Sequence, residues 1–444
     1  MSETRRAFLG KTAAAVAASG VAAGEVFADR MPKPVHRGKI DKNSKIRIAV
    51  IGFNGRGKDH IKGWLDHEDA ELVALCDVDQ TVLERGAATV KEKTKKAPRT
   101  YTDMRDLISD KGVDAVSIAT PNHWHSLAAI WAIQSGKDVY VEKPCSHNVF
   151  EGRQLVNAAR KHNAIVQHGT QVRSSAGIID AIQKLREGVI GDVYMARGLC
   201  FKRRDTIGHK PNSAPPPTLD WNLWQGPAPE REYNPNIAHY NWHWFWNYGN
   251  GDIGNQGVHQ MDVARWGLNV GLPNKVSSMG GMFLFDDDKE VPNTITTAFH
   301  FGDNGKNEKM LVFDTRPWYT NDEDGAKIGI LFYGSKGFMV IDSYNRYKTY
   351  LGDKKEPGPT MDKGGDHYGN FLDAVRARDP KILHAEILEG HLSSSLCHLG
   401  LISVRLGRSF DYDAEREQIP NDPEANALLT AMYRVPFVVP KIDA

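Results

Sequence analysis

The sequence predicts an α/β protein with two domains, a doubly wound parallel sheet followed by an α/β domain with a large, mostly antiparallel open sheet. Strand and helix patterns alternate over residues 45–169, whereas strand-like runs separated by turn residues dominate residues 275–351. The 444 residues are enough to build two cores. The net charge of +1 and the apolar fraction of 41% exclude a disordered chain and a binder of nucleic acid.

Residues 1–28 have the pattern of a twin-arginine signal peptide. Arg5 and Arg6 precede an Ala-rich stretch over residues 12–23, and Ala28 ends a segment that a signal peptidase can read. The stretch is too short and too weakly apolar to span a bilayer, which takes about 20 strongly apolar residues. We expect export to the periplasm, a polar linker over residues 29–44 and no membrane contact after cleavage; an amphipathic N-terminal helix is the alternative.

The N-terminal domain, residues 45–169, contains short β-branched runs separated by helical stretches. Strands are expected at residues 46–51, 72–76, 115–119, 139–141 and 165–166, and helices at residues 58–66, 81–95, 125–135 and 149–162. Because the two patterns alternate, the strands should be parallel and helices should cover both faces of the sheet.

The C-terminal domain, residues 170–444, has a different order of elements. A helix and a strand lead into a proline-rich loop, after which further strands and two helices follow. The expected helices are residues 178–187, 368–377 and 387–406, the loop is residues 203–239, and the expected strands are residues 193–201, 294–301, 310–313, 328–333 and 338–342. This order indicates a mostly antiparallel sheet with helices on one face.

A glycine turn, Gly52-Phe53-Asn54-Gly55-Arg56-Gly57, follows the first strand and opens a helix. Backbone N–H groups of such a turn can approach a pyrophosphate at the helix N-terminus, where the dipole favours anions. The second glycine of the usual G-x-G-x-x-G pattern is Asn54 here, a residue that tolerates positive φ, and Gly55 lies beside it. An ordinary strand–turn–helix is the alternative.

Asp77 favours the dinucleotide interpretation of this turn. It ends the second strand, 20 residues after Gly57. An acidic residue at this place accepts hydrogen bonds from the adenosine ribose hydroxyls and repels a 2′-phosphate. The sequence therefore predicts a Rossmann domain that binds NAD, with NADP the weaker ligand.

The loop Thr120-Pro121-Asn122-His123-Trp124-His125 follows a strand at the edge where doubly wound sheets bind ligands. We expect Thr120, Pro121, Asn122 and His125 to contact the cofactor, although Asn122 could also be a plain helix cap. The two histidines have no third ligand at suitable spacing, and the four cysteines lie far apart. The sequence therefore predicts no metal site.

Glu142-Lys143-Pro144 stands at the C-terminal end of another buried strand, from which Glu142 and Lys143 can reach the cofactor. A desolvated ammonium has a lowered pKa, so Lys143 could exchange a hydroxyl proton. Farther along the chain, His259 and Asp262 share one face of a predicted helix, where the carboxylate could orient the imidazole. The alternative for His259 is a structural role, which is the usual one for a lone histidine on a helix.

These motifs together resemble the glucose–fructose oxidoreductase/inositol dehydrogenase (Gfo/Idh/MocA) family, from about Lys45 to the C-terminus. The resemblance implies that Lys143 lies beside cofactor and substrate, and that His259 exchanges the substrate hydroxyl proton. It also implies that Gln171 and Arg173 contact the substrate. Many members of the family assemble through the open sheet, so a homodimer or homotetramer is implied.

The sequence departs from the family pattern at Asn255, because the family commonly has an aspartate four residues before the catalytic histidine. An asparagine can hydrogen-bond a sugar hydroxyl but cannot take its proton. This leaves open how Lys143, His259 and nearby Asp252 divide the proton transfer.

Tryptophans are concentrated ahead of the histidine segment, and the run from Tyr240 to Trp246, which includes Trp242 and Trp244, leads directly toward it. Their faces could stack on the C–H faces of sugar rings. The alternative is that these rings pack the long loop onto the protein, since large aromatics dominate burial everywhere.

We therefore expect an oxidoreductase that transfers hydride between a sugar or polyol carbon and a tightly bound nicotinamide. The first alternative is an NAD-dependent glycosidase that oxidises the sugar transiently, eliminates the aglycone and reduces again. Related glycosidases of this kind generally lack Glu-Lys-Pro and carry a different histidine segment. A catalytically inert sugar-binding protein is the second alternative, and the presence of Lys143 and His259 counts against it.

Replacing Asp77 by serine together with introducing a neighbouring arginine should relax the cofactor preference toward NADP, because the repulsion of the 2′-phosphate is removed. Titration calorimetry with both dinucleotides measures the change. Tighter binding of NADP than of NAD by the unmodified protein would overturn the assignment.

Overall fold

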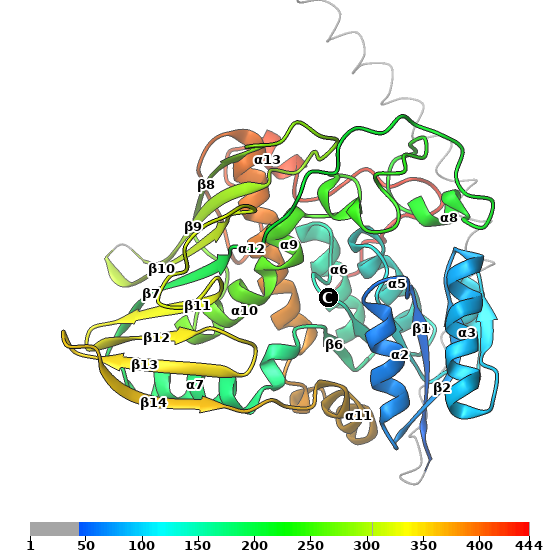
Figure 1. Cartoon of the computed structure of the whole chain (residues 1–444), viewed down its shortest axis with the longest axis horizontal. Coiled ribbons are helices and arrows are strands. Elements are labelled where there is room, and N and C mark those ends of the chain that lie inside the picture. The colour runs from blue at the N-terminus through cyan, green and yellow to red at the C-terminus, as the bar shows by residue number, and fades with distance from the viewer. Residues whose placement is uncertain (1–43, 304, 444) are drawn as a thin grey trace, which may run out of the picture.

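The computed structural model describes residues 44–303 and 305–443 and contains two sheets with helices packed on them (Figure 1). A six-stranded parallel sheet comes first, and a nine-stranded mixed sheet follows. The predicted fold class is confirmed. The predicted signal peptide, and the linker except for Ser44, lie outside the described residues.

The N-terminal sheet has the strand order β3-β2-β1-β4-β5-β6, and every neighbouring pair is parallel. Its strands are β1 (Ile46–Ile51), β2 (Ala70–Cys76), β3 (Arg99–Tyr101), β4 (Ala115–Ile118), β5 (Asp138–Val141) and β6 (Val166–His168). The direction of the strand order reverses between β1 and β4. Sheets of this type bind ligands outside the carboxyl ends of the strands at that point.

Helices cover both faces of this sheet. One core joins it to α2 (Gly57–Asp66), α3 (Gln80–Thr94) and α11 (His367–Ala377), and the other joins it to α4 (Met104–Ser109), α5 (Asn122–Gln134) and α6 (Val149–Lys161). α11 comes from the C-terminal part of the chain, where Phe371 packs against Trp64 and Tyr140. The chain therefore returns to complete the core of the N-terminal sheet.

The second sheet has the order β14-β13-β12-β11-β7-β10-β9-β8-β15. β7 is parallel to β10, and the other neighbouring pairs are antiparallel. The strands are β7 (Val193–Cys200), β8 (Lys275–Gly281), β9 (Thr294–Asp303), β10 (Lys306–Thr315), β11 (Ile328–Gly334), β12 (Gly337–Ile341), β13 (Arg346–Leu351), β14 (Glu356–Asp362) and β15 (Phe410–Asp411). The helices α7 (Ala176–Arg186), α10 (Gly257–Leu268) and α12 (Ile387–Leu406) share a core with it.

Shorter helices lie in the connections between these elements: η1 (Gln171–Ser174), α8 (Trp221–Gln225), η2 (Asn241–Trp244), α9 (Gly251–Asn255), η3 (Pro380–Ile382) and α13 (Pro423–Ala427). Residues 218–246, here called the strap, cross from the second sheet to the N-terminal sheet (green in Figure 1). Asp220 N donates to Val78 O at 3.0 Å, and His239 Nε2 lies 3.0 Å from Asp79 Oδ2. Because Val78 and Asp79 follow β2 closely, the strap is fixed at the carboxyl edge of the N-terminal sheet.

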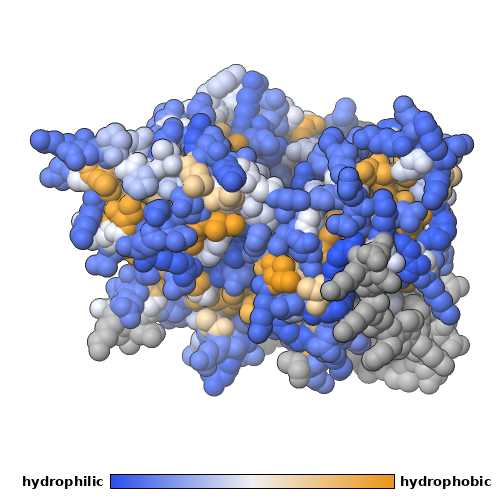
Figure 2. Space-filling model, turned by 90° about the horizontal axis from the view of Figure 1, so that it is seen from below, coloured by the Kyte–Doolittle hydropathy of each residue, from blue (hydrophilic) through white to orange (hydrophobic). Residues whose placement is uncertain are grey.

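Hydrophilic side chains cover most of the face shown in Figure 2, and apolar ones form small separate groups on it. Within residues 44–303 and 305–443, no helix combines the length and the hydrophobicity needed to cross a membrane. All four cysteines are buried and unpaired with one another.

Candidate functional site

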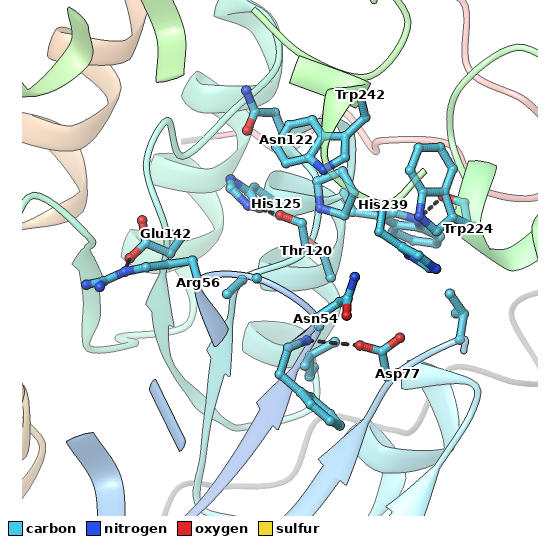
Figure 3. A pocket seen from close by; sticks show the side chains of 18 of the residues that line it. Asn54, Arg56, Asp77, Thr120, Asn122, His125, Glu142, Trp224, His239 and Trp242 are labelled. Atoms are coloured by element: carbon cyan, nitrogen blue, oxygen red, sulfur yellow. Dashed lines mark hydrogen bonds and ion pairs between the residues drawn. The ribbon is translucent and has the colours of Figure 1, made fainter. Parts of the chain in front are cut away.

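A cavity of about 300 Å³ lies between the glycine turn, the loop after β4 and the strap (Figure 3). Most of the predicted site residues meet in its wall, although they come from distant parts of the chain. They are Gly52, Asn54, Gly55, Arg56, Asp77, Thr120, Pro121, Asn122, His125, Glu142, Lys143, Trp242 and Asn255. Gly57, the remaining glycine of the turn, begins α2 behind this wall.

The glycine turn is shaped by close backbone contacts. Gly52 has φ +77°, and a Cβ there would lie 2.9 Å from the backbone of Thr120. A Cβ on Gly57 would lie 2.1 Å from Gly52 O, whereas one on Gly55 would meet nothing within 4 Å. The positive φ is thus supplied by Gly52, while Asn54 Oδ1 accepts a hydrogen bond from Arg85. The open space at Gly55 fits the close approach of a pyrophosphate.

Asp77 lies directly after β2 and lines the same cavity. Its carboxylate accepts hydrogen bonds from Phe53 N at 2.9 Å and from Asp79 N at 3.1 Å. Burial raises the pKa of Asp77, and the two N–H donors act in the opposite direction. Each carboxylate oxygen can accept a further bond, so Asp77 remains able to bind ribose hydroxyls.

The loop after β4 offers further polar groups to a dinucleotide. The hydroxyl of Thr120 is buried and has no hydrogen-bond partner, although Thr120 lines the cavity. His125 is held between two backbone carbonyl oxygens, those of Thr120 at 2.7 Å and of Pro144 at 2.6 Å. Asn122 Nδ2 donates to Asn250 Oδ1 at 3.0 Å. These groups fit the predicted cofactor, because an orphaned hydroxyl gains a partner when a polar ligand fills the cavity.

Glu142 is the most highly coordinated charge at the site. Its Oε1 accepts hydrogen bonds from Arg56 at 3.0 Å, from Gln171 at 3.1 Å and from the ring of His60 at 3.1 Å. Burial raises the pKa of Glu142, but the His60 hydrogen bond and the charge of Arg56 hold it well below its usual range. Glu142 is therefore a carboxylate, and Gln171, predicted to contact substrate, is one of its ligands.

Lys143 lies beside this carboxylate and reaches across to α9. Its Nζ donates to the backbone oxygen of Asn255 at 2.5 Å and is 3.3 Å from Asn255 Oδ1. Desolvation lowers the pKa of Lys143, while the charge of Glu142 acts in the opposite direction. The structure thus brings together Lys143 and Asn255, two of the predicted catalytic residues.

The predicted pairing of His259 with Asp262 is wrong. Asp262 instead accepts hydrogen bonds from Arg173 Nε at 2.8 Å and from Ser393 at 2.6 Å. A guanidinium compensates the buried carboxylate better than a neutral imidazole does. His259 is left with a buried, unpartnered Nδ1, and burial lowers its pKa to about 3.

Three other residues occupy different places from those predicted. Arg173 is 4% exposed and pairs with Asp262 and Glu389, so it supports α10 and α12 and does not face a substrate. Asp252 is paired with Arg204 at 2.7 Å. The guanidinium compensates the negative charge of the carboxylate, which Asp252 would need in order to take a proton. Trp244 is buried under the guanidinium of Arg204 and lies outside the cavity wall.

The strap supplies a part of the site that the sequence did not reveal. Leu223, Trp224, His239, Tyr240 and His243 line the cavity together with Trp242. In Figure 3, Trp224, His239 and Trp242 lie opposite Asn54 and Asp77. No local motif marks these residues, because their placement depends on the contact between the strap and residues 78–79.

Tyr344 is a second residue that the motifs did not indicate. It lies in the turn between β12 and β13, its ring packs 5.2 Å from that of His259, and its side chain is 41% exposed. Its hydroxyl accepts a hydrogen bond from Gln256 at 3.0 Å. An exposed aromatic face beside His259 is suited to contact the C–H face of a sugar.

A parallel sheet with a glycine turn, an acidic residue after β2 and a cavity at the switch point defines an NAD-binding oxidoreductase. Two family models agree with this. "Oxidoreductase family, NAD-binding Rossmann fold" matches residues 46–170, and "Oxidoreductase family, C-terminal alpha/beta domain" matches residues 200–277 and 323–439. The chain belongs to the Gfo/Idh/MocA family of oxidoreductases.

Curated relatives include glycosyl hydrolase family 109 proteins of Shewanella putrefaciens, 32% identical over 156 residues, and of Shewanella baltica, 30% identical over 202 residues. The matches cover 34% and 43% of this chain and 34% and 44% of the relatives. The chain thus spans less than half the length of the curated relatives it matches.

Solved structures show the same fold. The WlbA dehydrogenase from Bordetella pertussis in complex with NADH and UDP-GlcNAcA is 20% identical, with a TM-score of 0.63 over 83% of this chain and 99% of that one. Levoglucosan dehydrogenase in complex with NADH is 17% identical, with the same TM-score and coverage. At these identities the likeness establishes the fold alone.

Gly55→Ala should leave the melting temperature unchanged, since its Cβ meets nothing within 4 Å. We expect it to weaken NAD binding by about tenfold or more, roughly 1.4 kcal/mol, because the methyl group enters the space left for the pyrophosphate. Gly271→Ala, also free of contacts within 4 Å, is the matched control outside the cavity. Unchanged NAD affinity by calorimetry would show that the dinucleotide does not cross this turn.

Proposed function

We propose that this protein transfers hydride between a hydroxyl-bearing carbon of a sugar or polyol and NAD. The observation that carries the proposal is Lys143, which lines the cofactor cavity at the end of β5 and contacts Asn255 from the second sheet's part of the chain. A proton-exchanging group is therefore held where the two parts of the protein meet. The carbohydrate class is supported by Tyr344 and by the solved dehydrogenase whose complex contains UDP-GlcNAcA.

Lys143 and His259 have complementary roles in the proposed reaction. The glycine turn and Asp77 would hold NAD, which would supply the hydride acceptor. Lys143 exchanges the hydroxyl proton, since desolvation lowers the pKa of its ammonium. His259 is a neutral imidazole, because burial lowers its pKa to about 3, and a neutral imidazole can accept a proton. Asn255 can orient a hydroxyl through its amide.

A second candidate is an NAD-dependent glycosidase that oxidises, eliminates and reduces again. The names of the curated relatives, glycosyl hydrolase family 109 proteins, favour it. Incubation with chromogenic glycosides separates the two: release of the aglycone without net oxidation supports the glycosidase. Net oxidation of free sugars or polyols supports the dehydrogenase, and a bound cofactor that no substrate reduces would indicate an inert binding protein.

We further infer that the cofactor stays bound through the catalytic cycle. The strap lines one side of the cavity and is tied to residues 78–79, so it would contact a bound dinucleotide and slow its release. Retention fits the twin-arginine pattern at Arg5 and Arg6, since that route exports folded proteins with a cofactor already loaded. In the periplasm, the proposed location, retention avoids loss of NADH, and a second substrate or the same sugar would take the hydride back.

Lys143→Ala and His259→Ala should each retain the fold and the cofactor and lose about 10²–10⁴-fold in turnover, the usual contribution of an acid–base group. His300→Ala, on β9 and bound to Asn274, is the matched control. Reduction of the nicotinamide in single-turnover mixtures gives the rate, and thermal melting gives the stability. Wild-type turnover in either variant would disprove the mechanism, and a lower melting temperature at full turnover would assign a structural role.

Dialysis tests retention. The wild-type protein should keep its NAD and remain active without added cofactor, while Trp242→Ala should release NAD faster, because a wall of the cavity is removed. Trp318→Ala, outside the cavity wall, should behave as wild type. Absorbance of the dialysed protein measures the bound cofactor. If NAD washes out of the wild-type protein and activity then needs stoichiometric NAD, the retention proposal is wrong.

A further inference from the structure

A second cavity, of about 360 Å³, lies between α6, α12, residues 246–250 and C-terminal residues 427–433. Its wall includes five buried polar side chains, those of His123, Asn148, Glu151, Asn250 and His398. A cavity of this size is within the range that binds small molecules. The chemistry proposed above uses none of these five residues.

One wall group has an unused hydrogen-bonding atom. His123 Nε2 lies 3.1 Å from Trp224 O, so this nitrogen carries the proton, and Nδ1 is an acceptor. That Nδ1 is buried and has no partner among residues 44–303 and 305–443. Burial lowers the pKa of His123 to about 3, so the ring is neutral. A hydroxyl group of a bound ligand could therefore supply the donor that His123 Nδ1 lacks.

A cation at the rim also lacks a counterion. The guanidinium of Arg405 stacks over the ring of Trp246 with 4.8 Å between them, and both residues line the cavity. Within the described part of the chain Arg405 forms no ion pair, whereas Arg408, one turn on, pairs with Asp422 and Glu424. A guanidinium held flat by an aromatic ring is well placed to bind a carboxylate.

We propose that this second cavity binds a small polyhydroxy carboxylate, a sugar acid in its ring form. Arg405 would take the carboxylate, Trp246 would contact the C–H face of the ring, and a hydroxyl would donate to His123 Nδ1. Inorganic phosphate fits less well, because its oxygens would face the lone pair of His123 and meet a single cation. The wall has an acceptor for hydroxyls and a cation for one charge, and its own buried carboxyl, Glu151, already accepts hydrogen bonds from His147 N at 2.8 Å and from Asn148 Nδ2 at 2.9 Å.

The second cavity adjoins the cofactor cavity but is separate from it. Asn250 in its wall accepts a hydrogen bond from Asn122, which lines the cofactor cavity, at 3.0 Å. Asn250 also donates to His147 O at 3.2 Å and precedes α9, which ends at Asn255. The two cavities thus share a wall made by one pair of asparagines, and the proposal is independent of the reaction proposed for the first.

Calorimetry on the cofactor-loaded protein with D-glucuronate tests the proposal, with D-glucose and acetate as partial ligands. Arg405→Gln should weaken D-glucuronate binding about 10- to 100-fold, the usual contribution of a charge-assisted pair, and leave D-glucose binding unchanged. Arg203→Gln removes an arginine stacked on Trp318 at 4.8 Å and is the matched control. Acetate should bind more weakly than D-glucuronate, since it offers no hydroxyl.

Two further variants distinguish the outcomes. Ala431→Trp adds bulk at an exposed rim position and should block D-glucuronate, which keeps the test valid if Arg405→Gln does not fold. His259→Ala should leave the binding unchanged. Binding that is lost in His259→Ala but survives Arg405→Gln belongs to the first cavity and overturns the proposal. Absence of D-glucuronate binding, or equally tight binding of inorganic phosphate, also overturns it.

Discussion

The buried carboxylate of Glu142 is the charge on which the arrangement of the site depends. An ion in the protein interior costs several kcal/mol unless it is paired and hydrogen-bonded. Here the compensation comes from Arg56 at the glycine turn, His60 in α2 and Gln171 in η1. One carboxylate thus fixes the start of the first helix, the end of β5 and the entry into the C-terminal part of the chain. Lys143, the next residue, takes its position from this arrangement.

The strap and the N-terminal sheet together form the wall of the cofactor cavity. The sheet and its loops provide the side of the cavity that holds Asp77 and the glycine turn, and the strap provides the opposite side. Its aromatic rings have two roles. Trp221 and Trp224 stack with 4.7 Å between ring centres, and Tyr248 packs on Trp224, so this cluster stiffens the strap. Trp224 and Trp242 also line the cavity. The packing interpretation of the tryptophan-rich stretch therefore holds for Trp221 and Trp224, and stacking of a sugar on Trp242 stays a prediction.

The sequence predicted the parts of the site that short motifs at strand ends encode. The glycine turn, Asp77 and Glu142-Lys143-Pro144 are readable because each motif sits at a strand end, and parallel strands bring their ends to one edge. The strands β3, β8, β13, β14 and β15 were not among those predicted, and β3, β14 and β15 lie at sheet edges. β3 has three residues, and β14 carries Pro357 and Pro359, which edge strands tolerate but which hide the strand pattern.

Pairings between distant residues could not be predicted in the same way. Asp262 shares a helix face with His259, yet it pairs with Arg173, 89 residues away, because a buried carboxylate is stabilised most by a buried cation. No periodicity encodes such a choice. His239 and Tyr344 were not predicted as site residues for a related reason. Each reaches the site through the folding of a loop that carries no motif.

Asn255 shows how one departure from the family pattern changes the chemistry of its neighbour. An aspartate there would place a negative charge beside Lys143 and raise its pKa. Asn255 offers neutral oxygens instead, and nearby Asp252 is compensated by Arg204. Desolvation therefore dominates, and the pKa of Lys143 falls. An amide cannot take a proton, so in the proposed reaction Lys143 and the neutral imidazole of His259 carry the proton exchange between them.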